Sequence, residues 1–142
     1  MSITENLRKQ HHELLEIAAR LTRELDEHAL SRNASTARTT LSQFSGKLKV
    51  HLNMEDRSLY PRLIGSESET VRDTARSFIA EIGGIGEAFL KYLDRWPNSS
   101  SIQREPKEFI RETRDILSAV AKRIDKENRD LYPLVDRQGH SA

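Results

Sequence analysis

The sequence predicts an all-α protein, an antiparallel four-helix bundle in which successive helices run up, down, up and down. Two observations lead to this fold class. The 142 residues include only four prolines and six glycines, which cluster and leave long uninterrupted stretches. Within those stretches, apolar residues recur at alternating intervals of three and four, as on the inward face of a bundle helix. Helices of similar length joined by short loops are typical of this topology.

The first helix is expected to begin at Ser2, because Ser2 followed by Glu5 has the pattern of a capping box. The polar segment 31–35 ends it. Its inward face carries Leu7, His11, Leu14, Ala18, Leu21, Leu25 and His28. His12 lies about 100° around the helix from this face and is expected to contact solvent. His28 lies about 25 Å from His11 along the helix, so the two cannot serve one site.

The second and third helices are separated by the polar connection 65–69. The second is expected to end near Pro61, with Leu41, Phe44, Leu48, His51 and Glu55 on its inward face. The inward face of the third helix carries Val71, Ala75, Phe78, Ile82, Ile85, Phe89, Tyr92 and Trp96. Gly83, Gly84 and Gly86 weaken this helix and allow it to bend.

The last helix follows a loop at 96–101, and Pro106 suits its first turn. One line of its inward residues is Phe109, Thr113, Ile116, Val120, Arg123 and Glu127. An adjoining line is Ile110, Leu117, Ile124 and Leu131. We expect the bundle to comprise residues 1–136 and residues 137–142 to form a disordered tail.

Composition excludes several classes of protein. Lys and Arg number 23 against 22 Asp and Glu, and without a basic stripe we expect no nucleic-acid partner. The absence of cysteine excludes disulfides, thiolate metal sites and cysteine nucleophiles. No apolar run is long enough to span a membrane, and the polar N-terminus does not resemble a signal peptide, so a cytoplasmic protein is expected.

A near-repeat links the second and fourth helices. Residues 51–63 (HLNMEDRSLYPRL) and 123–135 (RIDKENRDLYPLV) align so that Glu55 matches Glu127, and Leu-Tyr-Pro follows in both. A histidine and a carboxylate four residues apart share one helix face, and such ligands suit iron, manganese or zinc. His11 and Glu55 each lie about two turns from the same end of the bundle. The candidate metal ligands are therefore His11, His51, Glu55 and Glu127.

These motifs resemble those of hemerythrin-like (HHE cation-binding) domains over nearly the whole chain. The resemblance rests on H-x-E-L-L at His11, HxxxE and LYP at His51, and ExxxLYP at Glu127. It implies a four-helix bundle around a non-haem di-iron centre, with about five histidines and two bridging carboxylates. It also implies roles in oxygen carriage or sensing, nitric oxide and iron sensing, or iron–sulfur repair. Carried over, it makes His11 and His51 ligands of the first two helices and Glu55 and Glu127 the bridging carboxylates.

The sequence departs from the family pattern because no histidine occurs between His51 and His140. The histidine of the third helix is therefore missing, with Ile82 the best match to its position, and Arg123 replaces the histidine of the fourth. We predict that Arg123 forms ion pairs with both Glu55 and Glu127, since a guanidinium bridges carboxylates well. The alternative is that Ile124 faces inward and Arg123 extends to solvent.

The resulting prediction is a hemerythrin-like domain with a degenerate metal site, a regulatory or interaction module without a di-iron centre and without enzymatic activity. The alternative is a protein with one iron or other divalent ion that senses or carries oxygen, nitric oxide or iron. An oxidase or repair enzyme would need a redox metal with an open position and is the weakest hypothesis. The regulatory hypothesis allows for a protein partner, which the sequence does not identify. Tyr60 and Tyr132 are expected to contribute packing.

Overall fold

The computed structural model describes residues 2–139, and within that range it is helical, with no strand. Two of its helical segments are π-helices, labelled η. The elements in chain order are α1 (Ile3–Arg23), α2 (Glu27–Arg32), α3 (Ser35–Met54), η1 (Glu55–Leu59), α4 (Tyr60–Ile64), α5 (Glu69–Ile82), α6 (Ile85–Arg95), α7 (Ser99–Arg104), α8 (Pro106–Lys126), η2 (Glu127–Leu131) and α9 (Tyr132–Gly139).

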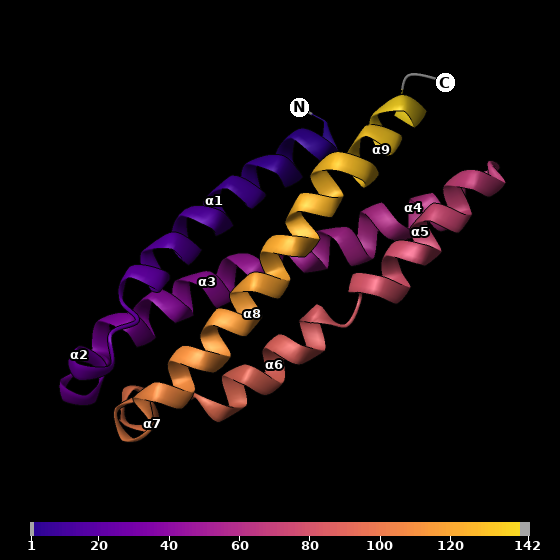
Figure 1. Cartoon of the computed structure of the whole chain (residues 1–142). Coiled ribbons are helices and arrows are strands. Elements are labelled where there is room, and N and C mark those ends of the chain that lie inside the picture. Colours follow the sequence, from indigo (N-terminus) through magenta and orange to yellow (C-terminus); the bar gives the residue numbers. More distant parts are fainter. Residues whose placement is uncertain (1, 140–142) are drawn as a thin grey trace.

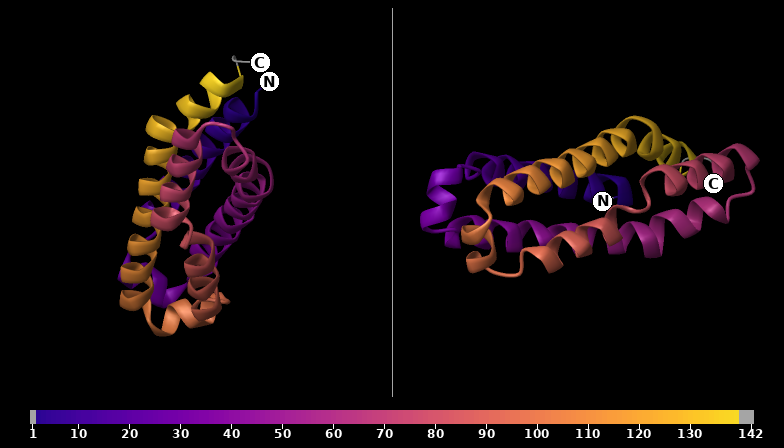
Figure 2. Two further views of the ribbon diagram at one scale, coloured as in Figure 1. Left: turned by 90° about the vertical axis from the view of Figure 1, so that its right-hand side faces the viewer. Right: turned by 60° about the horizontal axis from the view of Figure 1, so that its bottom comes forward.

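Four long segments lie lengthwise beside one another and form a helical bundle (Figures 1 and 2). From the N-terminus α1 runs to the far end of the molecule, where the short helix α2 turns the chain. The segment α3–η1–α4 returns, α5 and α6 run to the far end again, and α8–η2–α9 returns after α7 (Figure 1). The predicted all-α bundle is confirmed. None of the helices among residues 2–139 combines the length and apolar character needed to cross a lipid bilayer.

Local signals in the sequence explain where several helices begin. The side chain of Ser2 accepts a hydrogen bond from the backbone N–H of Glu5, as the first helix requires. Ser68 caps α5 in the same way, and Asn98 forms a capping box at α7. Pro106 occupies the first turn of α8.

The first and last segments differ from prediction at their ends. The first long helix stops at Arg23, and α2 begins separately because Asp26 accepts from the backbone of His28 and starts a new helix. The tail predicted from residue 137 is helical through Gly139. Arg137 lies in the last turn, where a cation is favourable to the helix dipole. The remainder of the predicted tail, 140–142, lies outside the described residues.

The apolar core is divided into two parts. The larger part fills the end near α2 and α7 and includes Leu14, Leu48, Ile85 and Val120, one residue from each of the four predicted inward faces. The smaller part, near the termini, contains Leu7, Leu59, Tyr60, Leu63, Val71, Ala75, Leu131, Tyr132 and Val135. Along α1, His11 falls between Leu7 of one part and Leu14 of the other, so a polar layer separates the two.

Both copies of the sequence repeat contain a π turn at the same place. The N–H of Tyr60 bonds to the carbonyl of Glu55, and that of Tyr132 to Glu127, each five residues back. The residue after each tyrosine is a proline, which has no N–H to continue the α-helical pattern, and the wider turn accommodates it. In an α-helix residues five apart point about 140° away from each other. With the π turn, each tyrosine lies in the bundle interior, as its glutamate does.

The third long segment is interrupted at Gly83 and Gly84, between α5 and α6 (Figure 1). A Cβ at Gly83 would lie 2.4 Å from the carbonyl oxygen of Ile79, so this position requires glycine. The interruption ends the α-helical hydrogen-bond pattern and leaves the carbonyl of Ile82 to accept from a side chain of α8. This departure from one continuous helix therefore supplies a polar group to the layer between the two parts of the core.

Candidate metal centre

Four side chains from three of the long segments converge in the polar layer. They are His11 of α1, His51 of α3, Glu55 of η1 and Glu127 of η2. One potential ligand atom of each lies within 4.8 Å of the others. Both histidines are 2% exposed and both glutamates 0%. The four residues selected from the sequence thus lie together, and a bundle interior with such donors is suited to a metal ion.

The two imidazoles meet through their Nε2 atoms. The Nε2 of His11 lies 3.0 Å from the Nε2 of His51 and 3.0 Å from Oε1 of Glu127. The Nε2 of His51 lies 3.2 Å from Oε1 of Glu55 and 3.7 Å from Oε1 of Glu127. Two imidazole nitrogens and two carboxylates therefore face one small volume.

The opposite nitrogen of each ring is held by an amide side chain. The Nδ1 of His11 lies 2.9 Å from Oδ1 of Asn128, and the Nδ1 of His51 lies 2.8 Å from Oε1 of Gln10. An amide oxygen only accepts, so each Nδ1 carries the proton. A histidine that ligates a metal usually donates its other N–H in this way, which leaves Nε2 for the ion.

Each tyrosine of the repeat donates to the carboxylate of the other half. The hydroxyl of Tyr132 lies 2.7 Å from Oε2 of Glu55, and that of Tyr60 lies 3.1 Å from Oε2 of Glu127. Tyr132 also stacks on the ring of His11, with centroids 5.1 Å apart. The expected packing of both tyrosines in the core is confirmed, and their hydroxyls also bind the glutamates, which was not predicted from the sequence. The signal was the Glu-x-x-x-x-Tyr-Pro spacing in both copies, which places the glutamate and the tyrosine of a copy in the same interior only when a π turn intervenes.

Arg123 lies inside the bundle, only 5% exposed, between the two glutamates. Its Nη2 donates to Oε1 of Glu55 at 3.0 Å, and its Nε donates to Oε2 of Glu127 at 3.2 Å. Its Nη1 donates to the carbonyl of Ile82 at 3.2 Å. Ile124 is buried as well, so the inward position of the isoleucine does not push Arg123 to solvent. Arg123 thus connects both carboxylates to the interruption between α5 and α6.

Burial and charge act against each other on the ionisable groups. Burial alone would lower the pKa of His51, but hydrogen bonds to Glu127 and Glu55 outweigh it and raise the pKa to about 9. Burial would raise the pKa of Glu127, but hydrogen bonds from His11 and His51 and the charge of Arg123 hold this pKa far below its usual value. Burial and the neighbouring Glu127 raise the pKa of Glu55.

Each tyrosine hydroxyl donates to a glutamate, and that of Tyr132 also lies 3.0 Å from Nε2 of His11. Burial, assisted by the charges of Glu127 and Glu55, raises the pKa values of both Tyr60 and Tyr132 far above the usual value. Both phenols are therefore neutral. The two glutamates consequently accept hydrogen bonds from phenol, guanidinium and imidazole groups together, which is how carboxylates are tolerated in an interior.

The remaining described histidines lie elsewhere. His12 is exposed and lies 3.1 Å from Glu16 across one helical turn, in agreement with the preference for His11. His28 is exposed, with its Nε2 3.4 Å from Arg32. His140 lies outside the described residues. Two histidines of the described chain are thus available to the buried cluster.

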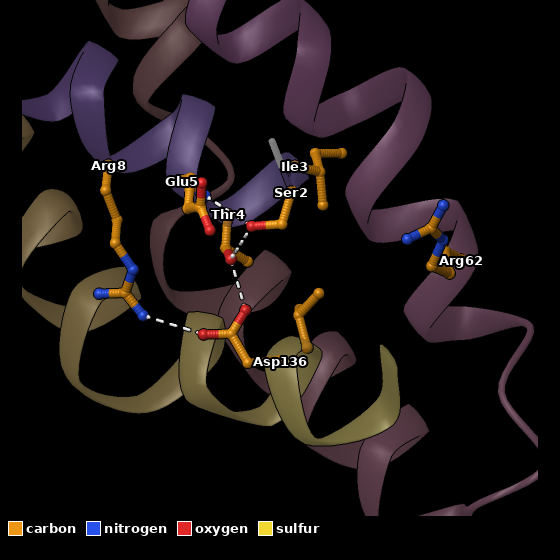
Figure 3. Close-up of a pocket in the computed structure, with 8 residues that line it drawn as sticks. Ser2, Ile3, Thr4, Glu5, Arg8, Arg62 and Asp136 are labelled. Atoms are coloured by element: carbon orange, nitrogen blue, oxygen red, sulfur yellow. Dashed lines mark hydrogen bonds and ion pairs between the residues drawn. The ribbon is translucent and has the colours of Figure 1, made fainter. Parts of the chain in front are cut away.

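Two cavities lie near the cluster. One, of about 220 Å³, lies beside Arg123 and is lined by Asp56, Tyr60, Pro61, Ile64, Ile79, Gly83 and Arg123. A larger cavity of about 560 Å³ lies at the end of the bundle near the termini (Figure 3). There Asp136 of α9 accepts from Thr4 and pairs with Arg8, while Arg62 lies apart on α4 (Figure 3). Arg8 also lies over the ring of Tyr132, so this end supports the cluster without contributing a ligand.

Comparison with known protein families identifies the family of the chain. Residues 2–135 match the family model described as the hemerythrin HHE cation binding domain. No curated protein and no solved structure matches. The family match covers every residue of the buried cluster.

Proposed function

Since the chain belongs to the hemerythrin HHE cation-binding domain family, we propose that it binds one divalent metal ion through His11, His51, Glu55 and Glu127. The observation that carries this proposal is the arrangement of the two histidines. Their Nε2 atoms lie 3.0 Å apart, while each Nδ1 is occupied by an amide oxygen. Both rings therefore present the nitrogen that an ion needs.

The donor set supports a transition metal rather than calcium or magnesium. Imidazole nitrogen with carboxylate oxygen suits iron, manganese or zinc, whereas calcium and magnesium prefer oxygen alone. When bound, Fe(II) would supply a one-electron redox centre in a water-poor interior. The protein would contribute the two histidines and two glutamates as ligands, and Tyr60 and Tyr132 as donors that orient the glutamates.

The number of ions follows from Arg123. Its guanidinium lies within 3.2 Å of both carboxylates, so it neutralises one of their two negative charges. A single divalent ion then leaves a small net charge, whereas a second ion would place two more positive charges beside a buried cation. At the position in the third long segment where the family has a histidine, Ile82 has no ligating side chain. Its backbone carbonyl already accepts a hydrogen bond from Arg123. We therefore propose a site that has lost the di-iron centre and retains one ion.

A metal-responsive regulatory or carrier role is the function that we propose for this site. The permanent positive charge of Arg123 stabilises the bundle both with and without the ion. A fold that is stable in both states suits a module that senses whether the ion is available. The second candidate is a module that never binds metal. Its support is the same Arg123, which together with protonated His51 can balance both glutamates.

Metal titration tests the proposal. Metal-free protein would be titrated anaerobically with Fe(II), and in parallel with Zn(II), and bound metal would be measured after gel filtration. We expect one ion per chain, loss of tight binding in His11→Ala, and parent-like binding in the matched control His12→Ala. Two ions per chain would contradict the role given to Arg123. Failure of the parent to bind either ion would favour the metal-free module.

A further inference from the structure

We infer that Gln10, held in place by Met54, is a positioning residue that keeps the proton of His51 on Nδ1 and so frees Nε2 for the metal. This inference rests on the proposed metal site. Gln10 precedes His11 on α1, but it acts on the histidine of α3, because its Oε1 lies 2.8 Å from Nδ1 of His51.

The orientation of the Gln10 amide is set from both ends. Its Nε2 donates to Sδ of Met54 at 3.0 Å, while its Oε1 accepts from His51. Met54 is the last residue of α3 and directly precedes Glu55. If the amide were rotated by half a turn, an N–H group would face the N–H of His51, and the carbonyl would face a sulfur that cannot donate. Met54 therefore favours the orientation that accepts the proton.

The need for this device comes from the carboxylates. In the metal-free protein the Nε2 of His51 faces Glu55 and Glu127, which are strong acceptors. A neutral His51 left to these neighbours would keep its proton on Nε2, the nitrogen that must coordinate. The carbonyl of Gln10 competes by stabilising the proton on Nδ1. Its removal therefore weakens metal binding through the tautomer, with both glutamates and both histidines intact.

Asn128 holds His11 in a related way, but its position is less constrained. Its Oδ1 accepts from His11 at 2.9 Å, and it directly follows the glutamate at 127 in η2. The two supports are crossed, since α1 orients the histidine of α3 while η2 orients the histidine of α1. Gln10 is the better subject for a test because the Met54 contact specifies its orientation.

The experiment compares Gln10→Ala, Gln10→Glu and Met54→Leu with the parent and with Gln43→Ala. Gln43 is an exposed glutamine of α3 whose side chain accepts from Arg20, so it controls for loss of a glutamine between the same two helices. Zn(II) affinity would be measured by competition with a chromophoric chelator. We expect Gln10→Ala to bind about 10- to 100-fold more weakly, the usual effect of removing such a partner. Gln10→Glu, which still accepts from Nδ1, should restore binding, and Met54→Leu should cause a smaller loss.

A second measurement does not depend on metal. Gln10 accepts the Nδ1 proton of His51 in the metal-free structure, and nitrogen-15 NMR should detect a slowly exchanging Nδ1 proton in the parent and in Gln43→Ala. That signal should disappear in Gln10→Ala and return in Gln10→Glu. Parent-like Zn(II) affinity in Gln10→Ala, or a persistent Nδ1 signal there, would overturn the inference while the metal site stood. Absence of Zn(II) binding in the parent would instead defeat the proposed function, and the NMR result would still decide the role of Gln10.

Discussion

Substitution of Arg123 by alanine is the most informative perturbation of the buried cluster. The change removes the donors to Glu55, Glu127 and the Ile82 carbonyl together, and all of these groups remain inside the bundle. Removing one partner of a buried ion pair costs about 3–5 kcal/mol, because the other charge is left without compensation. For a chain of this length, that loss corresponds to a fall in Tm of about 10–15 °C.

Urea unfolding of the metal-free protein is the assay, and Arg129→Ala is the matched control. Arg129 lies in η2, which directly follows the helix of Arg123, but it is exposed and pairs with Asp125 at 3.3 Å. Its removal should change the free energy of unfolding by no more than about 0.5 kcal/mol. Arg123→Lys should lie between the two variants, since an ammonium keeps the charge but cannot reach both carboxylates as a planar fork does.

The pH dependence provides a second, independent result. In the parent, Glu127 has a lowered pKa, so its contribution to stability is present above its unfolded pKa and is lost as the pH falls through the folded value. In Arg123→Ala at least one stranded carboxyl should have a raised pKa, so mild acid should recover part of the lost stability. A variant as stable as Arg129→Ala at both pH 7 and pH 5 would refute the structural role of Arg123.

Three further predictions concern the same cluster. The pKa of His51 rises from 6.5 to about 9 on folding, so His51 should contribute roughly 3 kcal/mol to the free energy of unfolding. This contribution should be fully present below pH 6.5 and lost as the pH rises through about 9. Urea unfolding at pH 6, 8 and 10 should show the decline in the parent and not in His51→Gln. Metal binding must displace the proton on Nε2 of His51, so Zn(II) affinity should rise about tenfold per pH unit up to about pH 9, and a flat profile between pH 6 and 8 would contradict the assigned ligand. Tyr132→Phe and Tyr60→Phe each remove a hydrogen-bond donor from a buried carboxylate, and each should lower the free energy of unfolding by about 1–3 kcal/mol. If both variants were as stable as the parent, water would have replaced the hydroxyls.

The sequence predicted the fold and the identity of the central residues because both depend on helical spacing. His11, His51, Glu55 and Glu127 lie on apolar faces with intervals of three and four, and those faces are buried in the bundle. Spacing also favoured His11 over His12, and the structure places His12 in solvent. These features need only the period of an α-helix, which a sequence displays directly.

The outer part of the cluster depends on departures from that period. Tyr60 and Tyr132 reach the glutamates because a π turn adds a residue to each helix, and an α-helical projection places them elsewhere. The third donor contact of Arg123 exists because the chain is interrupted after Ile82, which two glycines permit but do not require. Gln10 of α1 forms a hydrogen bond with His51 of α3, and no spacing of residues within α1 indicates this partner.

The replacement of a histidine by Arg123 in the second copy of the repeat has a physical rationale in the charge of the layer. Two glutamates lie between two apolar clusters, where unbalanced negative charge would be costly. Arg123 supplies one positive charge that is permanent, since a guanidinium does not lose its proton in proteins. His51 supplies a second that is exchangeable, because its Nε2 binds a proton in the metal-free protein and is the nitrogen required by an ion. A histidine in place of Arg123 would make both charges exchangeable, and the whole charge balance of the metal-free bundle would then depend on protonation. With one fixed and one exchangeable charge, a metal ion competes with a single proton and not with the folding of the bundle.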